Sequence, residues 1–418
     1  MIPPGYKQTE VGVIPEDWEV KTLSRVADIR GGIAKNSNAA TTDPISVHYL
    51  RVANVQDGFL DLAEMSKIHI SRADLPRYKV VPGDVLMNEG GDLDKLGRGA
   101  IWRGEYAPCV HQNHVFVVRC KANLLPEYLN IWTATSPVRR FFLTAGKQTT
   151  NLASISKSSL GELPVALPSL PEQYAISTAL SDVDALIAAL DRLIAKKRDL
   201  KQAAMQQLLT GQTRLPGFKG EWVVMTLGEL GSFTKGSGIK KDESQSGPIP
   251  CIRYGEIYTR HHDYIKEFHS FISAEVAVTA SLLKQGDILF AGSGETKAEI
   301  GKCVAFVNDC EAYAGGDIVI LRPQGVDSLF LGFSLNTPAI NRQKASRGQG
   351  DAVVHIGSSA LADISLNLPP LPEQTAIASV LSEMDAELAG LEQRREKTRA
   401  LKQGMMQELL TGRTRLMG

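Results

Sequence analysis

Two stretches of the chain carry apolar residues at alternating spacings of four and three positions. The first pattern consists of Ile176, Leu180, Val183, Ile187, Leu190 and Ile194, and the second of Ile377, Leu381, Met384, Leu388 and Leu391. This alternation is typical of helices that pack along one seam. It predicts two long helices, over 171–210 and 372–411, each about 60 Å long. A helix packed on its own domain would also show a stripe, but strict heptads occurring twice favour a helix pair.

Both patterns begin and end with residues that mark helix boundaries. Proline and an acidic residue suit the first helical turn, and glycine suits the position after a helix end. The matching residues are Pro171 and Pro372, Glu172 and Glu373, and Gly211 and Gly412.

The sequence contains an internal repeat that spans about half of the chain. Residues 167–215 align without a gap with 368–416, with 28 identities in 49 positions. Fainter matches pair Trp18 with Trp222, and 83–86 with 286–289. The repeat predicts a variable domain over 1–165, a near-identical segment over 166–212, a second variable domain over 213–366 and a second near-identical segment over 367–418.

The connectivity predicts the direction of the helices. The first leaves the first variable domain and the second leaves the second, so a packed pair must be antiparallel. Joining the end of the chain to its beginning would recreate the internal junction at 214–219. Runs such as 115–118 and 317–321 predict strands, and 126–142 and 328–345 predict helices. The predicted fold is α+β: two mixed α/β domains separated by an antiparallel coiled coil of two long helices, with pseudo-two-fold symmetry.

Charge and composition restrict the function. The 418 residues include 46 basic and 46 acidic side chains. Any positively charged surface that binds nucleic acid must therefore be local. No stretch approaches 18 uncharged apolar residues, so we expect no membrane span. The five cysteines are scattered and form no Cys-x-x-Cys pair. This usage predicts reduced thiols in the cytoplasm, with neither a zinc site nor a disulfide framework.

Several segments imitate catalytic motifs only in part. The run 290–294 resembles a methyltransferase glycine loop, but the other domain does not keep the pattern. Asp287 with 295–297 resembles an acidic nuclease triad, yet its counterpart has no matching lysine. The segment 146–149 lacks the earlier glycine of a phosphate-binding loop. His261-His262 has no partner at metal-ligand spacing. We therefore predict no catalytic residue and no metal ligand in this chain.

The variable domains instead offer polar loops whose side chains suit phosphates and base edges. For any one of these residues, an ordinary solvated loop position is the alternative interpretation. The candidates in the first domain are Lys35, Asn36, Arg51, Asn54, Lys95, Arg98, Lys147 and Gln148, and those in the second are Lys235, Lys240, Lys241, Arg253, Tyr254, Lys297, Lys302, Arg347 and Gln349. Arg51 and Arg253 occupy matching places in the repeat, which strengthens those two.

The whole chain resembles the specificity subunits of type I restriction-modification systems. The resemblance rests on the domain order, the Leu-Pro-x-Leu-Pro-Glu-Gln openings at 167–173 and 368–374, and the Leu-Leu-Thr-Gly endings at 208–211 and 409–412. It implies that each variable domain is a target-recognition domain that reads one half of a split target in double-stranded DNA. The helices would set the gap between the halves, and the chain itself would catalyse nothing.

The resemblance also implies partners. Two methyltransferase subunits that bind S-adenosylmethionine and methylate adenine would dock on the chain, and two motor-nuclease subunits using ATP and magnesium would complete the enzyme. The chain itself would hold no cofactor. We expect exposed apolar residues off the helix seam to contact the methyltransferase, with Leu186, Leu208 and Leu209 as candidates. The alternative function is a dumbbell scaffold that binds proteins or carbohydrate.

Overall fold

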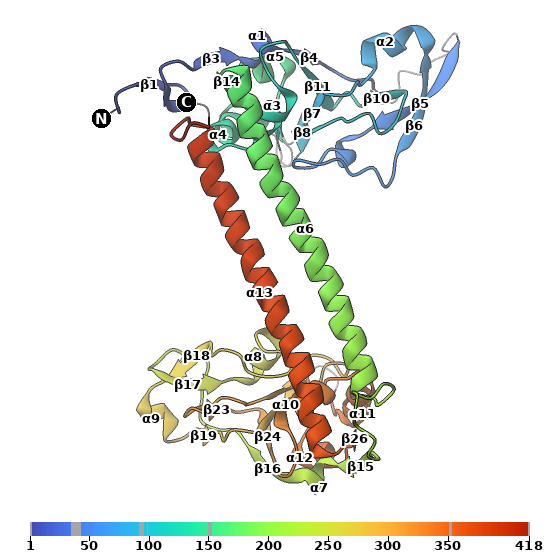
Figure 1. Cartoon of the computed structure of the whole chain (residues 1–418), viewed down its shortest axis with the longest axis vertical. Coiled ribbons are helices and arrows are strands. Elements are labelled where there is room, and N and C mark those ends of the chain that lie inside the picture. Colours follow the sequence, from blue (N-terminus) through green and yellow to red (C-terminus); the bar gives the residue numbers. More distant parts are fainter. Residues whose placement is uncertain are drawn as a thin grey trace. The chain divides into compact units, whose positions relative to one another are not determined.

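The computed structural model describes residues 2–34, 43–91, 96–97, 99–148, 153–350 and 353–416. The chain divides into two compact units. Unit one comprises Met1–Asp191 and Arg394–Gly418, and unit two comprises Arg192–Gln393. We call the part of unit one that precedes the first long helix head one, and the part of unit two between the two long helices head two (Figure 1).

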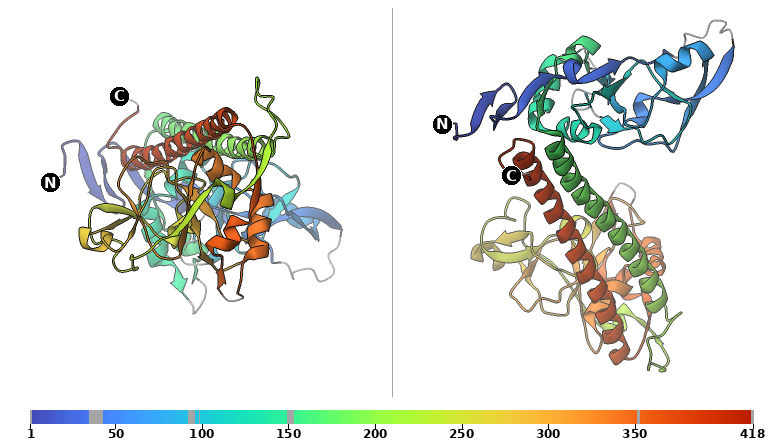
Figure 2. Two further views of the ribbon diagram at one scale, coloured as in Figure 1. Left: turned by 90° about the horizontal axis from the view of Figure 1, so that it is seen from below. Right: turned by 45° about the horizontal axis from the view of Figure 1, so that its top comes forward.

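The two long helices have the predicted character. They are α6 (Leu170–Leu208) and α13 (Leu371–Leu409), each of 39 residues. In unit one, Asp184 of α6 pairs with Lys402 of α13, and Asp191 of α6 pairs with Arg399 of α13. Residue numbers therefore increase along α6 in the direction in which they decrease along α13, so the helices are antiparallel. Within each unit the helices lie side by side in every view (Figures 1 and 2). The predicted helices and their antiparallel pairing are confirmed, although both helices end two residues earlier than expected.

Unit two repeats the same ion pairs at equivalent positions. Lys201 binds Asp385 at 2.7 Å, and Arg198 binds Glu392. These pairs join the second half of α6 to the first half and the middle of α13. The antiparallel direction in this unit therefore rests on its own contacts.

Head one is a mixed α/β structure built around a four-stranded sheet in the order β4-β11-β7-β9. A smaller sheet, β10-β5-β6, contains one parallel pair, and β12-β13-β8 forms a third. Its strands are β1 (Tyr6–Thr9), β2 (Gly12–Pro15), β3 (Glu19–Thr22), β4 (Ala27–Arg30), β5 (Pro44–Leu50), β6 (Ser66–Ser71), β7 (Val85–Asn88), β8 (Gly90–Gly91), β9 (Gly99–Ile101), β10 (Cys109–His111), β11 (Val115–Cys120), β12 (Lys147–Gln148), β13 (Ala153–Ser154) and β14 (Pro164–Leu167). Its helices are α1 (Leu23–Val26), η1 (Val52–Asn54), η2 (Arg72–Asp74), α2 (Leu75–Tyr78), α3 (Pro126–Trp132), α4 (Ser136–Ala145) and α5 (Lys157–Gly161).

Head two repeats this topology. Its main sheet has the order β16-β24-β20-β22, and its smaller sheet has the order β18-β17-β23-β19, again with one parallel pair. Its strands are β15 (Val223–Thr226), β16 (Gly231–Lys235), β17 (Ile249–Ile252), β18 (Ser270–Ile272), β19 (Ser281–Leu282), β20 (Ile288–Ala291), β21 (Ser293–Gly294), β22 (Cys303–Ala305), β23 (Tyr313–Ala314), β24 (Ile318–Pro323), β25 (Val354–His355) and β26 (Ser365–Leu368). Its helices are α7 (Leu227–Leu230), α8 (Tyr254–Thr259), α9 (Ala274–Ala277), α10 (Ser328–Ser334), α11 (Pro338–Arg347) and α12 (Ser358–Ala362).

The helices predicted over 126–142 and 328–345 are each broken in two. Thr135 and Thr337 have extended backbones (ψ of 155° and 152°) and act as N-caps of α4 and α11. Pro137 and Pro338 follow in the first helical turn, where a missing N–H costs nothing. The continuous helices that the sequence predicted are wrong at these positions, because the prolines start new helices.

The repeated Gly-Asp motif closes a turn in each head. The glycine before each aspartate has a left-handed backbone, with φ of 90° and 96°. Asp84 and Asp287 are fully buried, and each carboxylate accepts a bidentate pair of hydrogen bonds, from Arg119 and from Arg322. The N–H three residues upstream also donates to each carboxylate, at 2.8 Å. The motif is therefore a structural ion pair, and Asp287 has no free oxygen for nuclease chemistry.

The helix-opening Pro-Glu-Gln motif joins each helix to its surroundings. Glu172 is 1% exposed and accepts hydrogen bonds from Arg415 and from the indole N–H of Trp18. Glu373 binds Arg214 in the same way. The glutamine that follows each glutamate bonds to backbone atoms of the same head. Each motif therefore ties the start of one long helix to the segment that follows the end of the other.

The ends of the long helices belong to the cores of the heads. Leu180, Leu409 and Leu410 pack with Trp18 and Tyr128 in unit one. In unit two, Leu208, Leu209 and Leu381 lie in the same cluster as residues of the main sheet of head two. Each head is therefore completed by both helices. No helix among the described residues is long and apolar enough to cross a membrane.

Candidate nucleic-acid interface

The matching arginines Arg51 and Arg253 occupy the same structural position in the two heads. Each follows the central strand of the smaller sheet and caps the short helix that comes next, η1 or α8. The backbone N–H donates to Asn54 Oδ1 at 2.9 Å in head one and to Glu256 Oε2 at 3.2 Å in head two. Both arginines are half-buried. The repeat therefore presents one fixed cation at the same point of each head.

Asn54 has a structural role in this arrangement. It is 3% exposed, and both of its amide atoms are used, Oδ1 by Arg51 N–H and Nδ2 by the carbonyl of Asp61 at 2.8 Å. The prediction that Asn54 is available to DNA is not supported by this burial. Asn54 instead forms part of the cap of η1.

Head two brings several predicted residues together around α8. Arg253 and Tyr254 begin this helix, and Tyr258 further along it packs against Gly294, where a side chain would meet the tyrosine hydroxyl. Lys302 Nζ donates to the carbonyl of Tyr258 at 3.1 Å. Burial lowers the pKa of Lys302, while Asp263 and Glu299 oppose that shift.

A small ladder of strands lies beside Gly294. Ser293 of β21 pairs with His355 of β25, and His355 pairs on its other side with Gln349 through backbone bonds of 2.9 and 2.8 Å. Ser293 Oγ also lies 2.9 Å from His355 Nδ1. Of these residues, the sequence singled out only Gln349.

Head one contains the equivalent ladder. Lys147 pairs with Ser154, and Ser154 pairs with Gly90 of β8. Asn88, two residues before Gly90, donates to the carbonyl of Val55 just after η1, at 2.9 Å. The ladder and the arginine-capped helix are thus neighbours in head one as well.

The remaining candidates of head two are more dispersed. Lys235, Lys240, Lys241 and Lys297 are exposed. The carbonyl of Lys241 accepts from Ser244 Oγ, which also lies 3.5 Å from Arg253 Nη1, so this loop lies next to the capping arginine.

Arg347 is engaged within head two. Its guanidinium donates to the carbonyls of Gln343 and Asp363, at 3.0 and 3.1 Å. Arg347 is therefore anchored at the end of α11.

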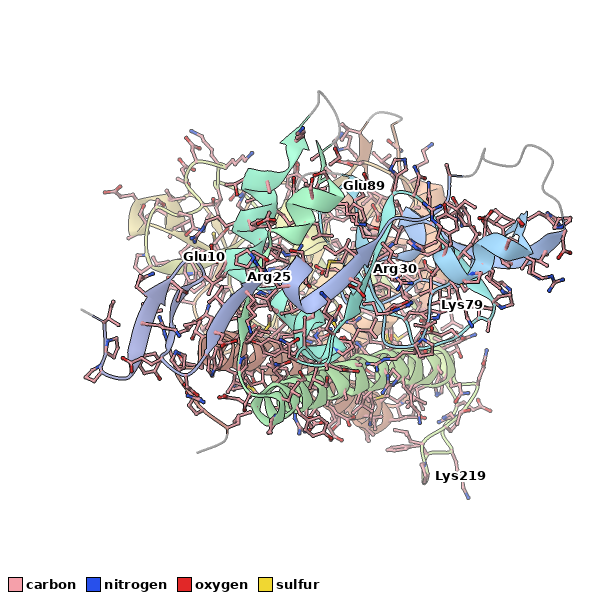
Figure 3. The ribbon with its side chains drawn as sticks, turned by 90° about the horizontal axis from the view of Figure 1, so that it is seen from above. Glu10, Arg25, Arg30, Lys79, Glu89 and Lys219 are labelled. Carbon is pink, nitrogen blue, oxygen red and sulfur yellow. The ribbon has the colours of Figure 1, made fainter. Side chains whose placement is uncertain are left out.

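Some candidates of head one lie outside the described residues. These are Lys35, Asn36, Lys95 and Arg98, and the side chain of Gln148 is also not described. Head one carries further cations that the sequence did not single out. Arg25 and Arg30 lie along α1 and β4, and Lys79 follows α2 (Figure 3).

The expectation that Leu208 and Leu209 are exposed is wrong. Both are 7% exposed and lie in the core of unit two, because the end of α6 enters head two. Leu186 is 40% exposed and keeps the predicted accessibility.

The titratable groups offer no activated nucleophile or metal cluster in the described part of the chain. Burial raises the pKa of Cys109, Cys120, Cys251 and Cys303 to about 12. Burial lowers the pKa of His261 to about 4. No group of three or more His, Cys, Asp or Glu side chains among the described residues could hold a metal ion.

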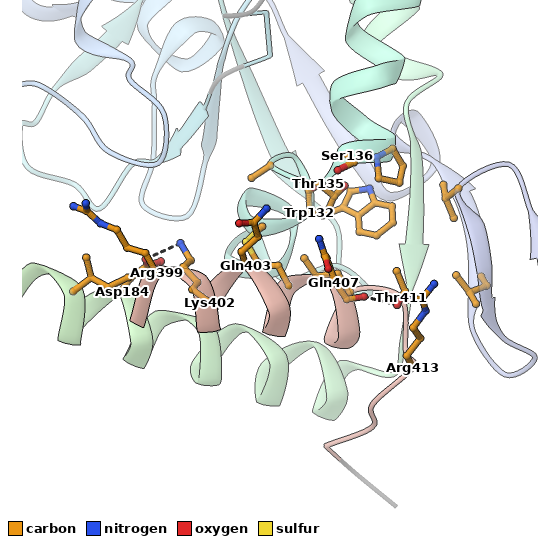
Figure 4. A pocket seen from close by; sticks show the side chains of 17 residues that line it. Trp132, Thr135, Ser136, Asp184, Arg399, Lys402, Gln403, Gln407, Thr411 and Arg413 are labelled. Carbon is orange, nitrogen blue, oxygen red and sulfur yellow. Dashed lines mark hydrogen bonds and ion pairs between the residues drawn. The ribbon is translucent and has the colours of Figure 1, made fainter. Parts of the chain in front are cut away.

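A cavity of about 660 Å³ lies within unit one between α13 and the α3–α4 junction (Figure 4). Trp132, Ile187 and Met406 line its apolar part, and the ion pair between Lys402 and Asp184 (2.6 Å) lies at its polar side. Of the residues predicted to contact DNA, those that the structure describes do not line this cavity.

Comparisons with known proteins find similarity to one family of proteins. Residues 15–196 and 219–399 match the family described as "Type I restriction modification DNA specificity domain". A protein of Methanocaldococcus jannaschii assigned as the type I restriction enzyme MjaX specificity subunit is 26% identical over 434 residues, covering 98% of this chain and 97% of the relative. The type I restriction enzyme EcoKI specificity subunit of Escherichia coli is 22% identical over 231 residues, covering 54% of this chain and 49% of the relative.

Solved structures share the fold. The S subunit of a type I restriction-modification system from M. genitalium aligns with a TM-score of 0.58 at 14% identity, covering 94% of this chain and 96% of that chain. The HsdS subunit from Thermoanaerobacter tengcongensis aligns with a TM-score of 0.52 at 17% identity, covering 99% of this chain and 100% of that chain.

Proposed function

Because the chain belongs to the type I restriction-modification DNA specificity family, we propose that it is the subunit that recognises DNA sequence in such a system. Each head reads one half of a bipartite target in double-stranded DNA. The observation that carries this proposal is the double family match, which covers each head together with part of the long helix that follows it.

The contrast between helices and heads supports an asymmetric target. The helical segments share 28 of 49 residues, whereas the heads keep the topology but few side chains. Two similar scaffolds that carry different polar groups read different bases. Near-identical helices suit two copies of the same partner.

We propose that the helix pair sets the gap between the half-sites. Half-sites met from one face of duplex DNA are about one helical turn apart, roughly 34 Å. A misplaced half-site would require the DNA to bend or twist, which costs free energy. Two continuous helices joined by ion pairs are stiff enough to impose that cost.

A subunit that recognises DNA sequence in such a system acts together with methyltransferase and motor-nuclease subunits. Two methyltransferase subunits with S-adenosylmethionine methylate adenine, and two motor-nuclease subunits with ATP and magnesium cut DNA. This chain supplies specificity, holds no cofactor and catalyses nothing. Leu186 remains the candidate contact for the methyltransferase, since it is the accessible one of the three predicted leucines.

The test is to exchange one head. Residues 20–165 are replaced by the corresponding segment of another specificity subunit, and the chain is produced with its methyltransferase partner. Adenine methylation is then mapped across a genome. Only one half of the methylated motif should change. A change in both halves, or in neither, would contradict the proposal.

A further inference from the structure

We propose that two exposed side chains in each head read bases: Gln349 and His355 in head two, and Lys147 and Ser154 in head one. They lie in a row of three cross-strand positions, whose third members are Ser293 and Gly90. This inference rests on the proposed function and assigns part of its chemistry to particular residues.

The pairing places the three residues of head two on one face. Residues directly opposite each other in antiparallel strands project to the same side of the sheet. Ser293 lies opposite His355, and His355 lies opposite Gln349. The exposed Gln349 and His355 are one strand spacing apart, about 5 Å. That spacing suits contacts with neighbouring base pairs, which are stacked at about 3.4 Å.

His355 is oriented before any DNA is bound. Ser293 is 7% exposed, and its hydroxyl lies 2.9 Å from His355 Nδ1, whereas His355 itself is exposed. The other ring nitrogen, Nε2, makes no hydrogen bond to the residues that the structure describes. A side chain held in place in this way loses less entropy when it binds. The imidazole therefore presents one polar atom outward from a fixed position.

The same backbone carries different chemistry in head one. Lys147 and Ser154 stand where head two has Gln349 and His355, and Gly90 stands where head two has Ser293. Lys147 and Ser154 are exposed. A glutamine amide can pair with the N6 and N7 atoms of adenine, whereas lysine donates to the O6 and N7 atoms of guanine. The two rows therefore have different base preferences on equivalent scaffolds.

Each row lies beside the element that carries the repeated arginine. In head two, Tyr258 of α8 packs against Gly294, next to Ser293. In head one, the carbonyl of Val55 accepts from Asn88, two residues before Gly90. Arg253 and Arg51 at the starts of these elements are suited to phosphate contacts that position the head. The row would then meet the base edges.

The experiment uses the full chain assembled with its methyltransferase subunit in a host without other adenine methyltransferases. The variants Gln349→Ala and His355→Ala are compared with Gln324→Ala. Gln324 is an exposed glutamine directly after β24, and its side chain makes no hydrogen bond to the residues that the structure describes. Genome-wide mapping of N6-methyladenine reports the motif. In each row variant, discrimination should fall about tenfold at one or two positions of one half-site, as expected for a lost specific contact. The other half-site and the Gln324→Ala motif should stay unchanged.

The outcomes separate the two proposals. If the unaltered complex gives no motif that depends on this chain, the proposed function fails. If the row variants co-purify with the methyltransferase and give the original motif, the base-reading row is overturned and the proposed function stands. An equal loss at all sites would also overturn the row, since it marks a phosphate or structural contact. Should an alanine variant fail to assemble, two milder variants must show the same local change. Gln349→Glu keeps the side-chain size, and His355→Asn keeps a polar group near the position of Nδ1 while it removes Nε2.

Discussion

At the scale of single residues, buried polar groups explain why short motifs recur. The glutamate at the start of each long helix is buried. It binds an arginine in the segment that follows the end of the other long helix. The Gly-Asp motif likewise binds an arginine of the neighbouring strand. These pairs hold segments that are distant in sequence. Several repeated residues are therefore structural, and repetition alone did not identify a binding residue.

The Glu373–Arg214 pair gives the first stability prediction. Glu373 is fully buried, so Glu373→Gln leaves the Arg214 charge without its partner. We expect a loss of about 2–4 kcal/mol of unfolding free energy, at the lower end for buried pairs because Arg214 is partly exposed. Urea unfolding measures the change, with Glu275→Gln on the exposed face of α9 as the control. An effect no larger than that of the control would show that the pair contributes little.

Two buried histidines predict that the folded chain becomes less stable in acid. Burial lowers the pKa of His111 in head one and of His261 in head two to about 4. An unfolded histidine has a pKa of about 6.5, so between pH 6.5 and 4 the unfolded chain binds more protons. Stability should therefore fall as the pH falls through this window, by up to about 1.4 kcal/mol per unit for each histidine.

The pH dependence of unfolding with His261→Gln checks this assignment. The slope between pH 6.5 and 4 should become shallower than in the unaltered chain. The matched control is the same replacement at His69, which is exposed. Parallel slopes for His261→Gln and the unaltered chain would refute the assignment.

At the scale of elements, the helix pair is specified by charge as well as by its apolar seam. The seam positions of the C-terminal halves include Lys201 and Lys402, which bind Asp385 and Asp184 at equivalent positions of the two units. Opposite charges placed across a helix pair fix its orientation and register. The apolar pattern alone would not have distinguished the antiparallel register.

Reversing one of these pairs tests its contribution. Asp385→Lys places two cations together and should lower the melting temperature by several degrees, since each kcal/mol is worth roughly 2–4 °C in a domain of this size. The double variant Lys201→Asp with Asp385→Lys should recover part of the loss. Recovery should be incomplete, because Lys201 also lies 3.5 Å from Asp263. A double variant no more stable than the single one would exclude a direct pair.

The sequence predicted the long elements better than the short ones. Heptads and boundary residues sufficed for α6 and α13, because these signals are local. The ladders at β12-β13-β8 and β21-β25 have two-residue strands, whose pairing depends on contacts distant in sequence. Ser154 and His355 therefore gave no sequence signal. Leu208 and Leu209 were misjudged for the same reason, since their burial depends on head two.

At the scale of the whole molecule, the zero net charge predicts a dependence on partners. The chain has 46 basic and 46 acidic residues, so few phosphates are neutralised by this chain alone. We expect the isolated chain to bind its target weakly, with an affinity that falls as salt rises, and the complex with the methyltransferase to bind tightly. Fluorescence anisotropy at about 50 and 200 mM salt measures both. Equally tight binding by the chain alone would contradict the expectation.

The central claim is that two different heads read two separate half-sites. Its most direct measurement is the motif methylated by the unaltered chain together with its methyltransferase partner, mapped over a genome. The account predicts two specified blocks of unlike sequence, separated by an unspecified gap of constant length. A continuous motif, a palindromic one, or a gap that varies from site to site would contradict it.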